Sequence, residues 1–362
     1  MREAVLFTHT RWDEAPRIRH QVARLLRDAG HRVLFLERGD LGLRRSCSDP
    51  REVEPGIWVA RPPRPIHPQL RIATALHHVD AWFVSRAIRE VVGSWSAGSG
   101  FSIFNFAHDG WWLRAAFPDR RITTIIHDDF EAQSRLPWHG HITWVLRRTC
   151  LASDRVLAVS QPLVERLSGW CSPELFLPWA VEPYVRPARS PDRRDLLFWG
   201  YVDNALDMSL VIDVAADIGR RSSPGRLLLV GPTQTRGVRP RIAREIASIA
   251  NIELHGPSQL DSLPLETVLA AVLPYRRSRA LDSVTLANKS MQLISRGLPL
   301  AISGMPRFME LPFVVRLDGP LGIPGCIDAC IAGFWQWQDA MREFCERNAP
   351  RTRLEALGST RP

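Results

Sequence analysis

Apolar and polar residues follow a strand, helix, strand pattern over the first 36 residues. Residues 4–7 form an apolar run, residues 8–16 a polar loop, and residues 17–29 place their apolar side chains on one face at helical spacing, before a second apolar run at residues 32–36. Gly30 lies where the C-cap of such a helix belongs. Strands joined through a helix are usually parallel neighbours, so the pattern predicts a parallel sheet covered by helices.

The alternation continues to residue 178 and starts again after residue 194. Between these points, residues 183–194 hold three prolines and five charged residues but little that is apolar, a composition typical of a linker between domains. Residues 46–68 are also proline-rich and are not expected to form a regular helix. Further strands are predicted at residues 101–106, 122–126, 155–159, 174–177, 195–199, 227–230, 252–254, 268–273 and 298–302. Helices of the second half are predicted at residues 206–220, 239–249 and 288–296, and again after residue 323.

A chain of 362 residues is longer than one hydrophobic core usually supports, so two cores are expected. The repeated pattern predicts an α/β protein with two Rossmann-like domains. We place the first domain at residues 1–182, the linker at residues 183–194 and the second domain at residues 195–334. Residues 335–362 are expected to form helices that pack back across both domains.

The composition narrows the class of protein. Apolar residues make up 45% of the chain, yet no apolar run approaches the ~20 residues that span a bilayer. The first residues lack the pattern of a secretory signal, so the cytoplasm is the expected compartment. Six cysteines without a CxxC pair predict reduced thiols and no cysteine metal site.

The net charge of +9 predicts attraction to polyanions: nucleic acid, an anionic membrane face or phosphorylated small molecules. No nucleic-acid-binding motif is present, so nucleic acid is not an expected partner. Lys289 is the single lysine among 47 basic residues. It follows Asn288, the expected cap of helix 288–296, and a cation in the first turn of a helix opposes the helix dipole. Lys289 therefore marks a candidate anion site, with a solvated surface lysine as the alternative.

Ligands of open α/β sheets bind at the carboxyl ends of the strands, which directs attention to the loops at residues 8–16, 127–135, 200–207 and 274–289. Gly200 follows a strand and precedes a helix opened by Asp207, a place where a phosphate can approach the backbone. The alternative is a tight turn capped by Asp207. Neither half opens with a GxGxxG turn, so an ordinary NAD or FAD site is not expected.

Several segments together resemble a known family. The second half contains GYVDNALDMSLVIDVA, LLLVGP, NIELHGP, VLPY and NKSMQLISRGLPLAISG in this order, and resembles the donor domain of GT-B glycosyltransferases. The segments RWDEAPRIRHQVARLLRDAGHRVLFLE and ITTIIHDDFEAQSR resemble bacterial polysaccharide and cell-envelope glycosyltransferases. The resemblance implies the GT-B fold, in which two Rossmann-like domains face a central cleft. It assigns the acceptor to residues 1–182 and the nucleotide-sugar donor to residues 195–334.

Many retaining members of this class carry two glutamates ahead of a G-x-P turn. At the matching positions this chain has Val284 and Gln292, so the common retaining pattern of family 4 is not met. Lys-x-x-Gln followed by Gly-Leu-Pro is similar to the xanthan-type glucuronosyltransferase, an inverting enzyme that acts on a lipid-linked acceptor.

The resemblance also implies roles for individual residues. Lys289 would bind the donor diphosphate and Gln292 would stand near the ribose. The full set of implied donor-binding residues is Gly200, Tyr201, His255, Pro257, Tyr275, Asn288, Lys289, Ser290 and Gln292. The residues assigned to the acceptor are Trp12, Asp13 and Arg17, with helix capping as the alternative role of Asp13.

An inverting transferase needs a base that takes the proton of the acceptor hydroxyl. His127, Asp128 and Asp129 end a predicted strand of the acceptor domain, and Asp128 or Asp129 is the preferred base ahead of His127. Adjacent carboxylates raise each other's pKa, so one of the two is expected to have a raised pKa. The alternative is a pair of helix-capping residues. His139 and His141 lie nearby, but GT-B enzymes generally need no metal, and none is expected here.

The predicted activity is transfer of a sugar from a nucleoside diphosphate sugar, most simply a UDP-sugar, to a hydroxyl acceptor in polysaccharide, glycolipid or natural-product biosynthesis. No cofactor is expected beyond this co-substrate. A lipid-linked acceptor and peripheral contact with an anionic membrane fit the basic charge. The alternatives are a GT-B-shaped nucleotide-sugar epimerase and a catalytically silent binding subunit.

Overall fold

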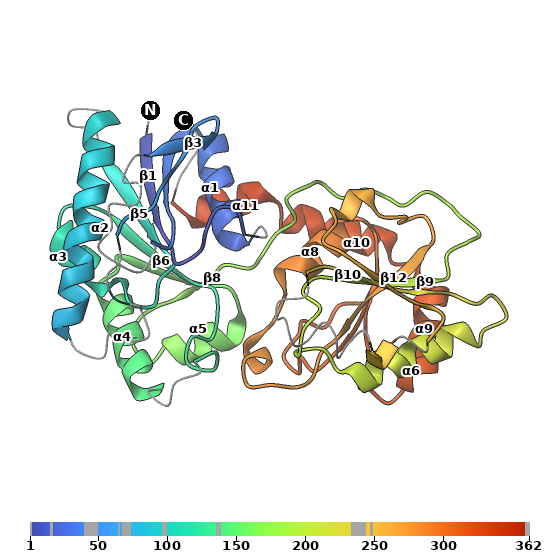
Figure 1. Ribbon diagram of the computed structural model, residues 1–362. Helices are drawn as coiled ribbons and strands as arrows, with labels where there is room; N and C mark the ends of the chain where they lie inside the picture. The colour runs from blue at the N-terminus through green and yellow to red at the C-terminus, as the bar shows by residue number, and fades with distance from the viewer. Residues whose placement is uncertain are drawn as a thin grey trace. The chain divides into compact units, whose positions relative to one another are not determined.

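The computed structural model describes residues 2–14, 17–39, 50–63, 66, 74–95, 100–134, 139–232, 244–246 and 249–358. The chain divides into two compact units, Met1–Leu177 with Pro350–Pro362, and Pro178–Ala349 (Figure 1). The predicted linker at residues 183–194 falls at the start of the second unit. Each unit contains its own sheet, as the alternating pattern predicts.

The first unit is built on an eight-stranded sheet in the order β3-β4-β2-β1-β5-β6-β7-β8. Every neighbouring pair is parallel except β3 and β4. Phe7 of β1 lies opposite both Leu36 of β2 and Asn105 of β5, so the loops after these strands leave one edge of the sheet. The strands are β1 (Arg2–Phe7), β2 (His31–Leu36), β3 (Arg51–Glu54), β4 (Ile57–Ala60), β5 (Phe101–Asn105), β6 (Ile122–Ile126), β7 (Arg155–Ala158) and β8 (Glu174–Leu175).

Helices cover this sheet and bury their apolar faces against it. In α1 the buried residues Val22, Leu25 and Leu26 recur at helical spacing, and Gly30 has the positive φ of 85° that follows many helix ends. The helices of the first unit are α1 (Ile18–Asp28), α2 (Thr74–Trp95), the short η2 (Gly110–Trp112), α3 (Leu113–Ala116), α4 (His139–Leu151), α5 (Gln161–Leu167) and α11 (Pro350–Ala356). Two of the described strands, β3 and β4, lie within the proline-rich region for which no regular helix was expected.

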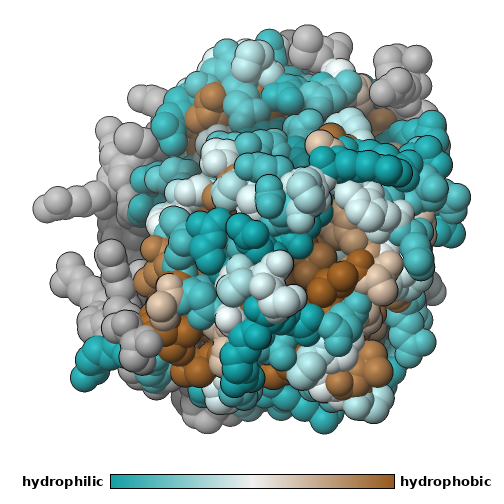
Figure 2. All heavy atoms as spheres, turned by 90° about the vertical axis from the view of Figure 1, so that its right-hand side faces the viewer, coloured by the Kyte–Doolittle hydropathy of each residue, from teal (hydrophilic) through white to brown (hydrophobic). Residues whose placement is uncertain are grey.

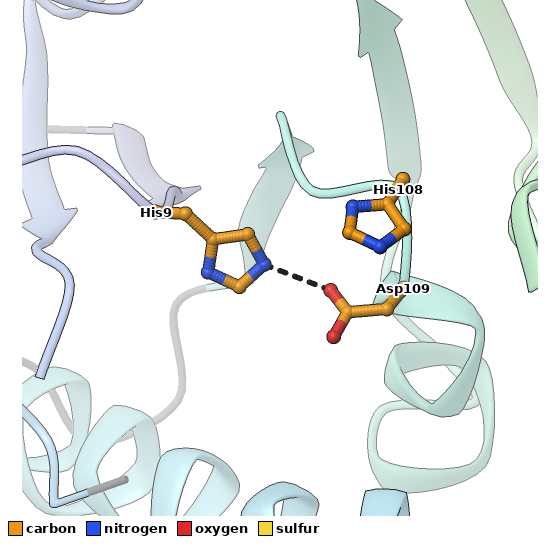
Figure 3. A group of neighbouring side chains, drawn as sticks. All are labelled: His9, His108 and Asp109. Atoms are coloured by element: carbon orange, nitrogen blue, oxygen red, sulfur yellow. Dashed lines mark hydrogen bonds and ion pairs between the residues drawn. The ribbon is translucent and has the colours of Figure 1, made fainter. Parts of the chain in front are cut away.

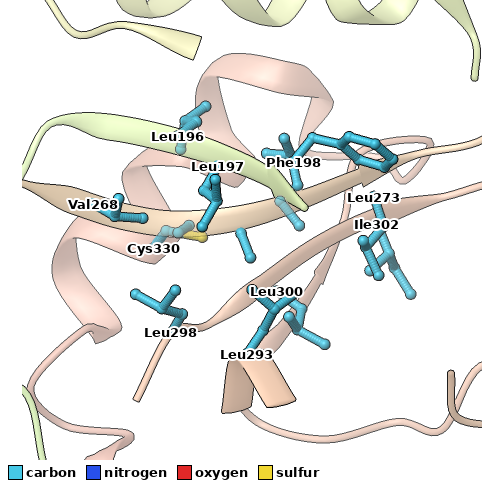
Figure 4. Close-up of a cluster of buried hydrophobic side chains, with 14 of the residues drawn as sticks. Leu196, Leu197, Phe198, Val268, Leu273, Leu293, Leu298, Leu300, Ile302 and Cys330 are labelled. Carbon is cyan, nitrogen blue, oxygen red and sulfur yellow. The ribbon is translucent and has the colours of Figure 1, made fainter. Parts of the chain in front are cut away.

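The second unit is built on a six-stranded parallel sheet in the order β11-β10-β9-β12-β13-β14. Its core packs Leu197, Phe198, Leu293 and Leu300, all completely buried, between the sheet and its helices (Figure 4). The strands are β9 (Asp195–Trp199), β10 (Leu227–Val230), β11 (Ile252–His255), β12 (Val268–Pro274), β13 (Leu300–Ser303) and β14 (Val314–Arg316). The helical segments are α6 (Met208–Gly219), η3 (Leu260–Ser262), η4 (Leu281–Ser283), α8 (Asn288–Ser295), α9 (Gly322–Gly333) and α10 (Gln338–Arg347).

The predicted strands and helices agree closely with the described elements, apart from the helix at residues 239–249, most of which lies outside the described residues. The stretch after residue 335 contains α10, which belongs to the second unit, and α11, which belongs to the first. Figure 2 shows one face of the molecule, on which hydrophilic residues alternate with separate apolar patches. Exposed apolar side chains at α9 include Leu321 and Ile331. Within the described residues no helix is long and apolar enough to span a bilayer.

Candidate functional site

At the carboxyl edge of the second sheet, two glycines allow close approach of neighbouring groups: Lys289 to Gly200, and the backbone of Gly200 to Gly231. Gly200 follows β9 with φ +153°, and a Cβ there would lie 2.5 Å from the Lys289 Nζ. Gly231 follows β10 with φ +151°, and a Cβ there would collide with the carbonyl oxygen of Gly200. The Gly200 N–H donates to the carbonyl of Val230 at 2.9 Å, which holds the two turns together. Both positions need glycine, and the space beside Gly200 is occupied by the Lys289 ammonium.

Three of the predicted donor-binding residues meet at this point. The Lys289 Nζ donates a hydrogen bond to the Tyr275 hydroxyl and lies 4.9 Å from the ring centroids of both Phe198 and Tyr275. Among the described residues, no carboxylate lies within ion-pair distance of this ammonium. The structure therefore brings Gly200, Tyr275 and Lys289 together around a cation that has aromatic neighbours and no protein counter-charge.

The first turn of α8 carries two further predicted residues. The helix begins at Asn288, and its N-cap is Ala287, so the prediction that Asn288 caps the helix is wrong by one position. Ala287 has the extended backbone of an N-cap residue but no side chain able to cap. The Asn288 Oδ1 and the Ser290 Oγ are buried without a hydrogen-bond partner among the described residues. Lys289 lies in the first turn, as predicted, flanked by two unsatisfied polar side chains of the kind that a ligand satisfies.

Gln292 is engaged elsewhere. Its Nε2 donates to the carbonyl of Trp179 at 3.3 Å, and its Oε1 accepts from the N–H of Val181 at 3.3 Å. Both ends of the amide thus fasten residues 179–181 to α8. Each end of the amide can form one more hydrogen bond, so contact with a ribose, which the resemblance implies for this residue, does not require these bonds to break.

The remaining donor candidates lie along the same edge but outside this group. His255 ends β11 and is exposed, and its Nε2 lies 3.1 Å from a carboxylate oxygen of Glu253. The Trp199 Nε1 donates to the carbonyl of Ser258 at 2.9 Å, which ties the loop containing Pro257 to the end of β9. Tyr201 follows Gly200 and is partly buried. These residues border the Lys289 group without joining it.

In the first unit, the predicted base His127 is enclosed. Its Nε2 accepts a hydrogen bond from Arg19 and lies 3.2 Å from Asp128, and its Nδ1 lies 3.5 Å from the carbonyl of Ile125. Burial, followed by the charge of Arg19, lowers the pKa of His127, whereas the neighbouring Asp128 raises it. His127 is thus held between a cation and a carboxylate.

The two adjacent carboxylates, Asp128 and Asp129, have different partners. The Asp129 Oδ2 pairs with Arg166 at 2.7 Å, and its Oδ1 accepts from the Ala132 N–H at 2.9 Å, so Asp129 closes a turn. Burial raises the pKa of Asp128, but His127 and Arg19 act more strongly together, and the pKa of Asp128 lies below its usual value. The expectation of a raised pKa is wrong for Asp128, because its close neighbours are hydrogen-bond donors and a cation. With a side chain 36% exposed, Asp128 is the most accessible of the three predicted bases.

The predicted acceptor residues are placed by α1 and the loop before it. The ring centroid of Trp12 lies 5.0 Å from that of Phe35, and the backbone N–H of Trp12 donates to the Glu37 carboxylate at 2.7 Å. Trp12 therefore holds the loop before α1 against β2 and the residue that follows it. Arg17 is the N-cap of α1 and pairs with Glu14 at 3.5 Å. Asp13 is exposed, and the alternative that it caps the helix is wrong, since Arg17 occupies the cap position.

Three residues at this edge were not predicted. The His9 Nε2 lies 2.8 Å from the Asp109 Oδ1, with side chains 20% and 1% exposed (Figure 3). His9 follows β1 and Asp109 follows β5, the neighbouring strand. His108 completes a group whose possible ligand atoms lie within 4.8 Å of one another, an arrangement that can also hold a metal ion. The only sequence signal is that both residues follow adjacent parallel strands.

Phe130 connects this group with the predicted bases. Its ring lies 5.1 Å from that of His108 and 5.1 Å from that of His127. The polar side chains after β1, β5 and β6 therefore form one continuous group at the edge of the sheet. His139 and His141 are not part of it: His139 Nδ1 lies 3.1 Å from the Glu131 carbonyl, and His141 stacks against Trp144.

Comparison with known proteins supports the predicted family. Residues 17–174 match the family model of Glycosyltransferase Family 4, which covers most of the first unit. No curated protein matches the chain in sequence.

Solved structures match over nearly the whole chain. Sucrose-phosphate synthase from Thermosynechococcus elongatus is 15% identical with a TM-score of 0.61, over 99% of this chain and 95% of that chain. An alpha,alpha-trehalose-phosphate synthase (UDP-forming) from Burkholderia vietnamiensis is 11% identical with a TM-score of 0.68, over 99% and 96%. HepE from Anabaena in complex with UDP-glucose is 12% identical with a TM-score of 0.64, over 99% and 100%. The predicted GT-B fold is confirmed, as is the resemblance to family 4 glycosyltransferases.

Proposed function

We propose that this GT-B protein transfers a sugar from a nucleoside diphosphate sugar, with UDP as the expected nucleotide, to a hydroxyl acceptor. The observation that carries the proposal is the group formed by Gly200, Tyr275 and Lys289 at the first turn of α8. Within the part of the chain that the structure describes, it combines a cation without a carboxylate partner, a helix N-terminus and two polar side chains without a hydrogen-bond partner. The match in fold to a protein bound to UDP-glucose favours the same class of donor.

The leaving diphosphate gains negative charge as the bond to the anomeric carbon breaks. In the proposed complex, the Lys289 ammonium and the first N–H groups of α8 stabilise that charge. Gly200 lets a phosphate approach the backbone because no side chain stands between the turn and the ammonium. Since the protein supplies these donors itself, we propose that no divalent metal is needed at the diphosphate.

The acceptor is assigned to the loops after β1, β5 and β6 in the first unit. At the positions of the glutamate pair of retaining relatives, this chain has Val284 and Gln292, and the Gln292 amide is bound to backbone groups. We propose an inverting displacement, in which the acceptor hydroxyl attacks the anomeric carbon directly while a base takes its proton. Of the two preferred bases, Asp128 is more exposed than Asp129, so we propose Asp128 as this base.

An aromatic surface on the first unit supports contact with a membrane. Val79, Trp82 and Trp144 are 44%, 56% and 43% exposed. Arg86 lies over Trp82 at 5.7 Å and Arg148 over Trp144 at 4.9 Å, so each indole has a cation beside it. Indole rings with adjacent cations suit the interface of an anionic bilayer. We propose that this α2–α4 surface touches the membrane and gives access to a lipid-linked acceptor.

Release of UDP from a panel of UDP-sugars, measured with and without a hydroxyl acceptor, tests the proposal. A transferase releases UDP faster when an acceptor is present. Conversion of the sugar moiety without an acceptor would indicate an epimerase instead. Binding of UDP without turnover of any donor would indicate a silent binding subunit.

A further inference from the structure

Two cysteines from separate elements meet in a small core of the first unit. Cys150 is the next-to-last residue of α4, and Cys171 follows the end of α5 by four residues. Cys150 belongs to a buried apolar cluster that includes Leu146 and Leu167, and Cys171 packs against that cluster. The two thiols share a hydrogen bond. Because the sulfur atoms are already in contact, a disulfide between them requires only a small movement.

Cys171 differs from the other cysteines of the described residues in its exposure. It is partly exposed, whereas the others are buried: Cys150, Cys326, Cys330 and Cys345. The hydrogen bond with Cys150 lowers the pKa of Cys171 and outweighs burial, which raises it. The same bond, followed by burial, raises the pKa of Cys150. Cys171 is therefore the thiol that meets a small oxidant as a thiolate, and Cys150 stays protonated beside it.

We propose that Cys171 and Cys150 form a reversible disulfide on oxidation by hydrogen peroxide, with Cys171 as the reacting thiol and Cys150 as the resolving thiol. The Cys171 thiolate attacks one oxygen of the peroxide, which gives a sulfenic acid and releases hydroxide. The Cys150 thiol then attacks the Cys171 sulfur, gives up its proton and displaces the hydroxyl group as water. In total, the two thiols lose two electrons and two protons, and hydrogen peroxide becomes two molecules of water.

The disulfide would join the end of α4 to the turn after α5. It closes a loop of about 20 residues, which restricts the unfolded chain. Arg166 on α5 pairs with Asp129 at 2.7 Å, and Asp129 closes the turn beside Asp128. The link therefore fixes the helix that supports the loop after β6. Oxidation is expected to raise the Tm by several degrees.

A second pair of thiols, Cys326 and Cys330, provides an internal control. These thiols also share a hydrogen bond, but both are buried, at 0% and 1% exposure, and they lie four residues apart on α9. Since neither thiol is accessible, this pair is expected to stay reduced in the folded protein at the same dose of peroxide. The exposure of Cys171, and not the contact of two thiols alone, distinguishes the proposed site.

The experiment treats the folded full-length chain with hydrogen peroxide, blocks the remaining thiols with N-ethylmaleimide during unfolding, and identifies linked peptides by mass spectrometry. The wild type is expected to yield peptides joined through Cys150 and Cys171, with two hydrogen atoms fewer than the reduced peptides. Dithiothreitol is expected to separate them. Cys150→Ser is expected to leave Cys171 as a sulfenic acid that dimedone traps. Cys326→Ser, the matched control, is expected to form the link as the wild type does.

Thermal unfolding separates the link from other oxidation. The Tm of the wild type is expected to rise after peroxide and to return after dithiothreitol, whereas that of Cys171→Ser stays unchanged. A link from Cys171 to another cysteine, Cys47 included, or oxidation of Cys171 to an acid without any link, would overturn the pairing. A Cys150–Cys171 link that leaves the Tm unchanged would overturn the proposed fixing of α5. None of these readouts requires turnover of a UDP-sugar.

Discussion

The carboxyl edges of the two sheets carry different kinds of ionisable side chain. All of the chain's 11 histidines except His255 precede residue 178, whereas its single lysine, Lys289, follows it. At the edge of the second unit, one ammonium stands among aromatic rings and glycines. At the edge of the first unit, His9 pairs with Asp109 and His127 pairs with Asp128. A fixed cation suits the binding of an anion, and groups that exchange protons suit chemistry on a hydroxyl.

The largest effect is expected at Lys289. Loss of one preorganised donor to a developing charge costs about 3 kcal/mol, so Lys289→Ala is expected to lower kcat/KM for the UDP-sugar by at least ~100-fold. Arg296→Ala is the matched control, because it removes a cation from the other end of α8, where Arg296 pairs with Asp261. If a folded Lys289→Ala variant has the same kinetics as the wild type, Lys289 does not bind the donor and the alternative of a solvated surface lysine holds.

Acid is expected to destabilise the first unit through a buried histidine. Burial, opposed by a hydrogen bond to the Arg11 carbonyl, lowers the pKa of His20 from 6.5 to about 4. Between these values the unfolded chain binds a proton that the folded chain does not, so stability falls as the pH drops from 6.5 towards 4. The full effect is on the order of 3 kcal/mol.

Urea unfolding at pH 7 and pH 4.5 measures the difference, with His20→Gln as the comparison. The variant is expected to lose less stability on acidification than the wild type. An equal loss in both proteins would show that other groups carry the acid sensitivity.

Gly200→Ala is expected to reduce turnover about tenfold, with a lower Tm. Alanine at φ +153° is strained, and its Cβ would lie 2.5 Å from the Lys289 Nζ, so the ammonium must move. Backbone strain of this kind costs of order 1–3 kcal/mol. Gly140→Ala is the control, since its Cβ would meet no atom within 4 Å. If Gly200→Ala matches the control in both kcat and Tm, the close approach of Gly200 to Lys289 is not needed.

The smallest effect concerns the α2–α4 surface. Trp82→Ala is expected to weaken binding to phosphatidylglycerol vesicles several-fold, with little binding to phosphatidylcholine vesicles in either protein, as measured by co-sedimentation. Ile331→Ala, which removes an exposed apolar side chain from the second unit, is the control. Equal binding by both variants would remove Trp82 from the membrane contact.

The sequence predicts the fold well because all strand pairs except β3 and β4 are parallel, and most strands are short apolar runs between helices. It also identifies Lys289, Gly200 and Tyr275 as candidate donor-binding residues, since each lies at the end of a strand or the start of a helix. The pairing of His9 with Asp109 was missed because it joins residues 100 positions apart in sequence, and depends on the register of β1 against β5. The pKa of Asp128 was misjudged because the adjacent His127, and after it Arg19 from another element, outweigh the burial that raises this pKa.

Binding of UDP in the presence of EDTA tests the central claim most directly. At 100 times its dissociation constant, a ligand stabilises the folded protein by about 2.7 kcal/mol, enough to raise the Tm by several degrees. The account predicts this rise with UDP in EDTA, its loss in Lys289→Ala, and no rise with NAD or FAD. A UDP effect that disappears on chelation, or one that is unchanged in Lys289→Ala, would contradict a metal-free diphosphate site at Lys289.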